Sequence, residues 1–147
     1  MNYPLTIKIA GPAGLGIKSG GLLLSQILLA HGFNIVDYSE YPSLIRGGHN
    51  TYQVSFSPQK IYSALRTVDF FYGLESNQFQ QHQSEFHSRT RIFAPDAKLT
   101  LPDYKNTTCL GSIAALLGLN PKICFNLIKK QYPKFIEQKG CFWVKRI

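Results

Sequence analysis

The sequence predicts an α/β fold in which a mostly parallel, Rossmann-like sheet is flanked by helices. Short apolar runs typical of strands alternate with longer segments typical of helices, which is the order of parallel strands joined by crossover helices. Two glycine-bearing motifs follow the first two predicted strands. A strand that ends in glycines before a helix presents free backbone N–H groups at the helix N-terminus, where anions bind.

The first third of the chain predicts a strand, a buried helix and a second strand. The apolar run 5–10 predicts a short strand that ends at Gly11. Residues 17–31 are apolar almost all round, so we expect a helix covered on several sides and ended by Gly32. The apolar run 34–38 predicts the second strand.

The middle of the chain predicts further strands. Residues 51–56 alternate in polarity and predict a strand, 57–60 a turn, and 61–63 a short returning strand. The apolar run 68–73 is typical of a central strand, and 91–94 predicts the last one.

Three more helices are expected. A polar helix is predicted over 76–87 with Ser76 as its cap, and another over 107–117. Asn120 and the proline after it form an N-cap and first-position pair for a helix over 121–131.

Composition indicates a globular chain with one domain, residues 1–147. Hydrophobic residues make up 44% and charged residues 16%, and no segment is long and apolar enough to span a membrane. The N-terminus carries no secretory signal pattern, so a cytoplasmic location is expected. The net charge of +8 suits phosphorylated cofactors, but the basic residues of the C-terminal third are typical of a solvated helix face. We therefore expect no nucleic-acid and no membrane partner.

The three cysteines, Cys109, Cys124 and Cys141, are far apart and form no CxxC pair. A local zinc or iron–sulfur loop is therefore not predicted, and these residues are interpreted as small buried thiols. No metal site and no catalytic nucleophile set follows from the spacing.

The first glycine motif is Gly11-Pro12-Ala13-Gly14-Leu15-Gly16. It permits three interpretations. It can cradle a pyrophosphate, with Asp37 binding a ribose hydroxyl as in dinucleotide-binding domains. The spacing of Gly11, Gly16 and Lys18 differs from that of a P-loop by one extra residue before the lysine. Finally, it can be a tight turn that needs positive φ and binds nothing.

The second motif is Tyr41-Pro42-Ser43-Leu44-Ile45-Arg46-Gly47-Gly48-His49-Asn50. Arg46 offers a planar fork suited to phosphate or carboxylate, and Gly47 and Gly48 let the backbone approach a partner. His49 is a candidate donor to a phosphate. The alternative is an ordinary glycine-rich turn. Both motifs are expected at the same, C-terminal edge of the sheet.

These motifs resemble a known family. Residues 7–57 are similar to the gamma domain of 2-oxoacid:ferredoxin oxidoreductases, and most similar to the form fused to the alpha subunit in 2-oxoglutarate-type enzymes. The Tyr-Pro-x-x-x-Arg-Gly-Gly-His-Asn signature is the more specific part, and the resemblance continues over 68–71 and 106–120. The tip of the first loop departs from the family, because Ala13-Gly14-Leu15 stands where two adjacent glycines and a glutamine are usual.

The resemblance implies a gamma component of a complex that converts a 2-oxoacid, coenzyme A and oxidised ferredoxin to acyl-CoA, CO₂ and reduced ferredoxin. Thiamine diphosphate and iron–sulfur clusters are then expected only in partner alpha and beta subunits or domains, and the isolated chain is expected to be inactive. Ferredoxin is reached through the complex, which is expected to form a dimer. Coenzyme A is the expected ligand, and its expected binding residues are Gly11, Gly14, Gly16, Lys18, Arg46, Gly47, Gly48 and His49.

Two alternatives stay open from the residues alone. One is a Rossmann-type nucleotide-binding oxidoreductase domain. The other is a non-catalytic interaction subunit whose glycine loops form only a protein interface.

Overall fold

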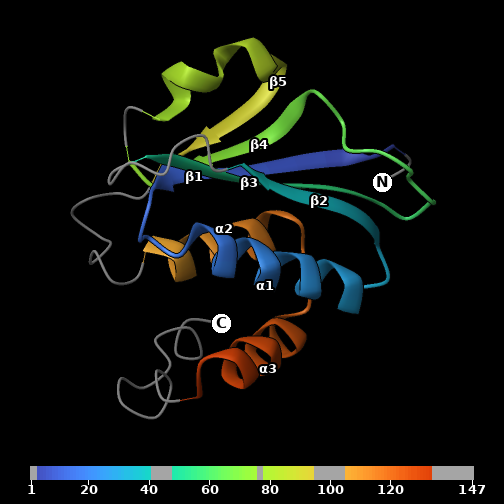
Figure 1. Ribbon diagram of the computed structural model, residues 1–147. Coiled ribbons are helices and arrows are strands. Elements are labelled where there is room, and N and C mark those ends of the chain that lie inside the picture. Colours follow the sequence, from blue (N-terminus) through green and yellow to red (C-terminus); the bar gives the residue numbers. More distant parts are fainter. Residues whose placement is uncertain (1–2, 41–47, 76–77, 95–104, 134–147) are drawn as a thin grey trace.

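The computed structural model describes residues 3–40, 48–75, 78–94 and 105–133 (Figure 1). Five strands form one sheet in the order β2-β3-β1-β4-β5. The elements, in chain order, are β1 (Leu5–Pro12), α1 (Ile17–Ala30), β2 (Asn34–Glu40), β3 (His49–Ser57), β4 (Val68–Gly73), the 3₁₀ helix η1 (Gln78–Glu85), β5 (Phe86–Phe93), α2 (Lys105–Leu116) and α3 (Pro121–Gln131).

The predicted α/β class is confirmed, and the sheet is mixed. β1 pairs with β4 and β4 with β5 in parallel, whereas β3 is antiparallel to both β1 and β2. β3 therefore runs against the other four strands. The path from β1 through α1 to β2 is a split βαβ unit with β3 inserted between its two strands.

One face of the sheet carries the apolar core and is covered by helices. Figure 1 shows α1 and α2 against this face and α3 beyond them. Ile7 on β1 and Val54 on β3 lie opposite each other and join Leu24 of α1 in one buried cluster. Gly21 of α1 allows the close approach of β3, because a Cβ there would lie 2.1 Å from the ring of Tyr52.

Over β1 and β3, the opposite face of the sheet is mainly polar and nevertheless buried, while Ala10, Val68 and Phe71 form a second, smaller apolar cluster. Its buried side chains come from β1 and β3 and are Thr6, Lys8, Thr51, Gln53, Ser55 and Ser57. The segment after β3 crosses this face: Gln53 Nε2 donates to the Leu65 carbonyl at 2.7 Å, and the Leu65 amide donates to Ser55 Oγ at 3.0 Å. The prediction of a strand at 61–63 is wrong. This segment has no strand, and side chains of β3 bind backbone groups of Leu65.

Several predicted boundaries shift. β5 begins at Phe86, so the end of the helix predicted over 76–87 is strand, and its described part is the 3₁₀ helix η1; Ser76 lies outside the described residues. Helix α2 begins before the predicted 107. Asn120 caps α3 as expected, accepting from the amide of Lys122 at 2.9 Å.

Two of the cysteines behave as the sequence predicts. Cys109 and Cys124 are buried and unoxidised, and burial raises the pKa of both thiols. Cys141 lies outside the described residues. None of the helices in the described ranges combines the length and apolar character that a bilayer crossing requires.

Candidate functional site

The first glycine motif forms the link between β1 and α1. Gly14 has φ 92° and Gly16 has φ 70°, both in the left-handed region that favours glycine. Gly16 is the N-cap of α1, and no side chain caps the first turn from this position. A Cβ at Gly16 would also lie 2.5 Å from Nδ2 of Asn106, which donates to the Leu15 carbonyl. The loop is therefore held from α2 and leaves first-turn amides without a side-chain cap.

The second motif lies against this loop. The amide of Ala13 donates to the carbonyl of Gly48 at 3.0 Å. At the start of β3, His49 is opposite Pro12 and Asn50 is opposite Gly11. The expectation that both motifs share one edge of the sheet is therefore confirmed. Arg46 and Gly47 lie outside the described residues.

An open groove of about 430 Å³ lies beside the loop. It is lined by residues of the loop, the first turns of α1 and the second motif, namely Gly14, Gly16, Ile17, Lys18, Ser19, Leu22 and Asn50. The Lys18 side chain is exposed. Gly11 has a different place, because a Cβ there would lie 3.0 Å from Cβ of Leu74. The groove thus unites three of the predicted residues, while Gly11 packs the base of the loop.

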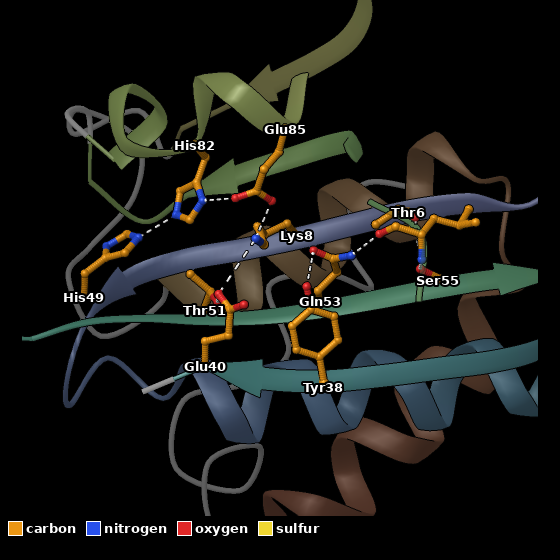
Figure 2. A network of polar contacts seen from close by, with 11 residues as sticks. Thr6, Lys8, Tyr38, Glu40, His49, Thr51, Gln53, Ser55, His82 and Glu85 are labelled. Atoms are coloured by element: carbon orange, nitrogen blue, oxygen red, sulfur yellow. Dashed lines mark hydrogen bonds and ion pairs between the residues drawn. The ribbon is translucent and has the colours of Figure 1, made fainter. Parts of the chain in front are cut away.

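His49 points away from this groove, into a chain of polar contacts on the other face of the sheet (Figure 2). Its Nε2 lies 2.6 Å from Nε2 of His82, and Nδ1 of His82 lies 2.7 Å from Oε1 of Glu85. The other oxygen of Glu85 accepts from Lys8, whose Nζ also lies 4.0 Å from Oε2 of Glu40. The sequence predicts His49 as a donor to a phosphate, and in the structure its Nε2 contacts His82.

The electrostatics of these polar contacts favour an ionised Glu85 and a neutral His49. Burial opposes ionisation of Glu85, but hydrogen bonds from His82 and Lys8 hold the pKa of its carboxyl below the usual value. Burial lowers the pKa of His49, and the neighbouring His82 lowers it further. The Lys8 side chain is only 2% exposed, so its ammonium depends on these carboxylates for compensation.

A family model described as pyruvate ferredoxin/flavodoxin oxidoreductase matches residues 6–103. The chain belongs to this family. The resemblance that the two motifs indicate is therefore confirmed.

Relatives in the oxidoreductase family cover nearly all of the chain. It is 24% identical over 161 residues to 2-oxoglutarate synthase subunit KorC of Archaeoglobus fulgidus, across 97% of this chain and 86% of that protein. The gamma subunit of a keto/oxoacid ferredoxin oxidoreductase from Geobacter sulfurreducens superposes with a TM-score of 0.74 at 14% identity, covering 91% of this chain and 88% of that one.

A larger protein contains the same fold. The 2-oxoglutarate:ferredoxin oxidoreductase of Magnetococcus marinus, solved with 2-oxoglutarate, coenzyme A and succinyl-CoA bound, matches with a TM-score of 0.76 at 21% identity. The match covers 92% of this chain but only 28% of that chain. These similarities show that the fold is shared with domains of pyruvate ferredoxin/flavodoxin oxidoreductase type.

The dinucleotide interpretation does not fit this member of the oxidoreductase family. The Asp37 carboxylate accepts from Ser25 and Tyr52 at 2.5 Å each, under α1, and is therefore engaged away from the glycine loop. In a dinucleotide-binding fold the second strand lies next to the first, whereas here β3 separates β2 from β1.

Sequence reasoning missed Lys8, His82, Glu85 and Asn106. The alternation of residues 5–10 was the available signal, since it places Lys8 on the face opposite Ile7 and Ile9. No sequence spacing connects Lys8 with Glu85, which are 77 residues apart. Within the four described ranges, no group of three or more His, Cys, Asp or Glu converges as a metal site.

Proposed function

We propose that the chain is the gamma component of a 2-oxoacid:ferredoxin oxidoreductase, formed by one gamma-type domain over residues 1–147. The observation that carries this proposal is the groove built jointly by the two glycine motifs, in a chain of this family. The relatives named as a 2-oxoglutarate synthase subunit and an oxoacid oxidoreductase gamma subunit match it over most of their length. The complex would convert a 2-oxoacid, coenzyme A and oxidised ferredoxin to acyl-CoA, CO₂ and reduced ferredoxin.

Within that complex, the groove binds the phosphates of coenzyme A. The uncapped amides at the start of α1 suit a pyrophosphate, and the left-handed conformations of Gly14 and Gly16 let it approach the backbone. The exposed Lys18 supplies positive charge. The coenzyme A and succinyl-CoA bound to the Magnetococcus enzyme support this choice of ligand.

The second motif completes the proposed binding set. Arg46 and Gly47 directly precede Gly48, whose carbonyl holds Ala13 of the first loop. Gly11 packs the base of the loop, and His49 acts from the opposite face of β3. Gly11, Arg46, Gly47, Gly48 and His49 thus join Gly14, Gly16 and Lys18 in the proposed set.

The redox chemistry belongs to partners. Alpha and beta subunits or domains would hold thiamine diphosphate and the iron–sulfur clusters, and ferredoxin would dock on the assembled complex, a dimer. The chain would contribute coenzyme A contacts and assembly contacts. The second candidate is a subunit that contributes assembly contacts alone.

Calorimetric titration of the assembled complex tests the ligand. Lys18→Ala is expected to weaken coenzyme A binding about tenfold, as for one charge-assisted phosphate contact. Lys122→Ala is the matched control, because Lys122 is also exposed but lies at the start of α3, where Asn120 contacts His31 at the far end of α1. Equal effects of the two variants, or tighter binding of NADH or FAD than of coenzyme A, would contradict the proposal. Unchanged binding with lost assembly would favour the second candidate.

A further inference from the structure

A side-chain amide at the start of α2 holds the first glycine loop. Nδ2 of Asn106 donates to the carbonyl of Leu15, which is 91 residues away in the sequence. A backbone carbonyl can only accept a hydrogen bond, so the NH₂ group of Asn106, and not its oxygen, must face Leu15. Gly16 permits this close approach, because a Cβ at that position would lie 2.5 Å from Nδ2 of Asn106.

The other end of the same amide lowers the stability of the fold. Oδ1 of Asn106 is buried and has no hydrogen-bond partner in the described part of the chain. Such an atom destabilises the folded state, because its hydrogen bonds with water are lost and not replaced. An apolar side chain of similar shape would avoid this loss. A buried polar group of this kind needs an explanation other than folding stability, and functional sites are where such groups are expected.

The contact between Asn106 and Leu15 fixes the direction of one peptide group. Leu15 and Gly16 share a trans peptide, since the described residues contain no cis peptide bond. The C=O and the N–H of a planar trans peptide point in opposite directions. The Leu15 carbonyl points to Asn106 on α2, and the Gly16 N–H therefore points away from α2. Gly16 also lines the groove, together with Lys18.

We propose that Asn106 is a positioning residue that orients the peptide between Leu15 and Gly16, so that the Gly16 amide donates a hydrogen bond to the anionic ligand of the groove. The inference rests on the proposed function for its ligand, a phosphate group of coenzyme A. Without Asn106 the peptide can turn its carbonyl toward the groove, where the oxygen would repel a phosphate. Asn106 itself lines a different cavity, so it acts on the ligand only through the loop.

This second cavity makes a clean substitution possible. It has a volume of about 210 Å³ and lies between α1, α2 and α3, where Asn106 borders it together with Gly20, Leu110 and Ile128. Asn106→Leu keeps a branched side chain but removes both the NH₂ donor and the buried oxygen without a partner. The cavity accepts the added volume of the leucine. The variant therefore separates the orientation of the loop from the packing around position 106.

Asn106→Leu should change ligand affinity and stability in different ways. The urea midpoint of the full chain is expected at or above that of the wild type, because the buried oxygen is gone. Coenzyme A binding to the assembled complex, measured by calorimetry, should weaken about tenfold, as for the loss of one charge-assisted hydrogen bond. A residue with only a structural role would instead lower the midpoint and leave the affinity of the folded molecules unchanged.

A second variant and a matched control complete the series. Asn106→Ala removes the same donor but enlarges the cavity, so its urea midpoint should fall. Its folded molecules should nevertheless bind coenzyme A as weakly as those of Asn106→Leu. Thr107→Val is the control, because Thr107 lines the same cavity but not the groove, and its affinity should equal that of the wild type. Normal affinity in Asn106→Leu, or affinities that follow the urea midpoints of the three variants, would overturn the inference.

Nitrogen-15 correlation NMR of the full chain tests the orientation of the peptide without any ligand. In the wild type, the Nδ2 hydrogens of Asn106 should exchange slowly with solvent, because one of them is bonded to Leu15. The Gly16 amide signal should shift in both Asn106 variants and stay in place in Thr107→Val. Rapid exchange of the Nδ2 hydrogens overturns the inference, and this wild-type measurement does not depend on whether a variant folds.

The two kinds of measurement also separate this inference from the proposed function. Slow exchange at Asn106 in a protein whose wild-type complex has no affinity for coenzyme A would overturn the proposed function and leave the orienting role of Asn106 standing. Coenzyme A binding that is equal in the wild type and in Asn106→Leu would overturn the inference and leave the proposed function standing.

Discussion

Replacement of Lys8 by Met probes the buried ion network without emptying the space of the side chain. Met fills the volume of the lysine stem but removes the ammonium that Glu85 and Glu40 face. The variant therefore isolates charge from packing. We expect a large loss of folding stability, in contrast to most lysine substitutions, which lie on exposed surfaces.

The structure sets the magnitude. Removing one partner of a buried pair costs about 3–5 kcal/mol, since the other charge is left without compensation. The Lys8 side chain is 2% exposed, but that of Glu85 is 25% exposed and keeps its contact with His82. This access to water places the expected loss at the lower end, about 3 kcal/mol. Glu40→Gln should cost less than about 1 kcal/mol, because Glu40 is half exposed and 4.0 Å from the ammonium.

The assay is urea unfolding of the full chain followed by circular dichroism, with a double-mutant cycle. Lys8→Met combined with Glu85→Gln should be less destabilised than the sum of the single variants, by at least about 1 kcal/mol. Glu40→Gln is the control for a weak partner of the same lysine. A Lys8→Met variant within about 0.5 kcal/mol of the wild type, or a strictly additive cycle, would refute the reasoning.

Three further outcomes are expected. Gly16→Ala should destabilise the chain more than Gly14→Ala in thermal unfolding, because both glycines have positive φ but only a Cβ at Gly16 would meet Asn106. The Gly14 change should cost about 1–2 kcal/mol of folding stability. Equal losses in the two variants would contradict the contact between position 16 and Asn106. Arg46→Ala should change folding stability by less than about 0.5 kcal/mol but weaken coenzyme A binding by about ten- to a hundredfold. If the variant is largely unfolded and its remaining folded molecules bind coenzyme A normally, Arg46 has a structural role instead. The purified chain alone should show no 2-oxoacid-dependent viologen reduction, and measurable activity without added subunits would refute the assembly proposal.

The pH dependence of stability follows from the same network. The pKa of Glu85 is lower in the folded chain than its usual 4.5, so its contribution is complete above that pH and is lost as the pH falls through the folded value. His49 also has a lowered pKa, so the unfolded chain takes up its proton first and stability falls as the pH drops below 6.5. Urea midpoints should therefore decrease from pH 7 to pH 4, and less so in Glu85→Gln.

Local signals predicted most of the fold. Apolar runs identified β1, β2 and β4, the alternation of residues 51–56 identified β3, and the prediction for 91–94 identified only the end of β5. Asn120 with its proline located the start of α3, because capping depends on neighbouring residues only. The order of strands was beyond such signals. Insertion of β3 between β1 and β2 depends on long-range pairing, and nothing in the alternation of residues 51–56 states which strand it joins.

The candidate site likewise has a part that local sequence signals predict and a part that depends on long-range contacts. Gly14 and Gly16 of the first loop were predictable because positive φ is a local requirement that few other residues meet. The polar contacts that join His49 to His82, Glu85 and Lys8 were not predictable. Lys8 lies on β1 and the other two on η1, and the sequence alone does not bring these elements together. The burial of Lys8 also contradicts the usual expectation that charged side chains are exposed.

Strand alternation explains why one motif serves two environments. Successive side chains of a strand point to opposite faces. Asn50, opposite Gly11, faces the helices and lines the groove, whereas His49, opposite Pro12, faces the polar side and meets His82. Two adjacent residues of the second motif therefore connect the groove beside the first glycine loop with the buried ion network. A shift of β3 by one residue would exchange these faces, placing an imidazole in the groove and an amide against His82. The antiparallel register between β1 and β3 is thus part of the site itself.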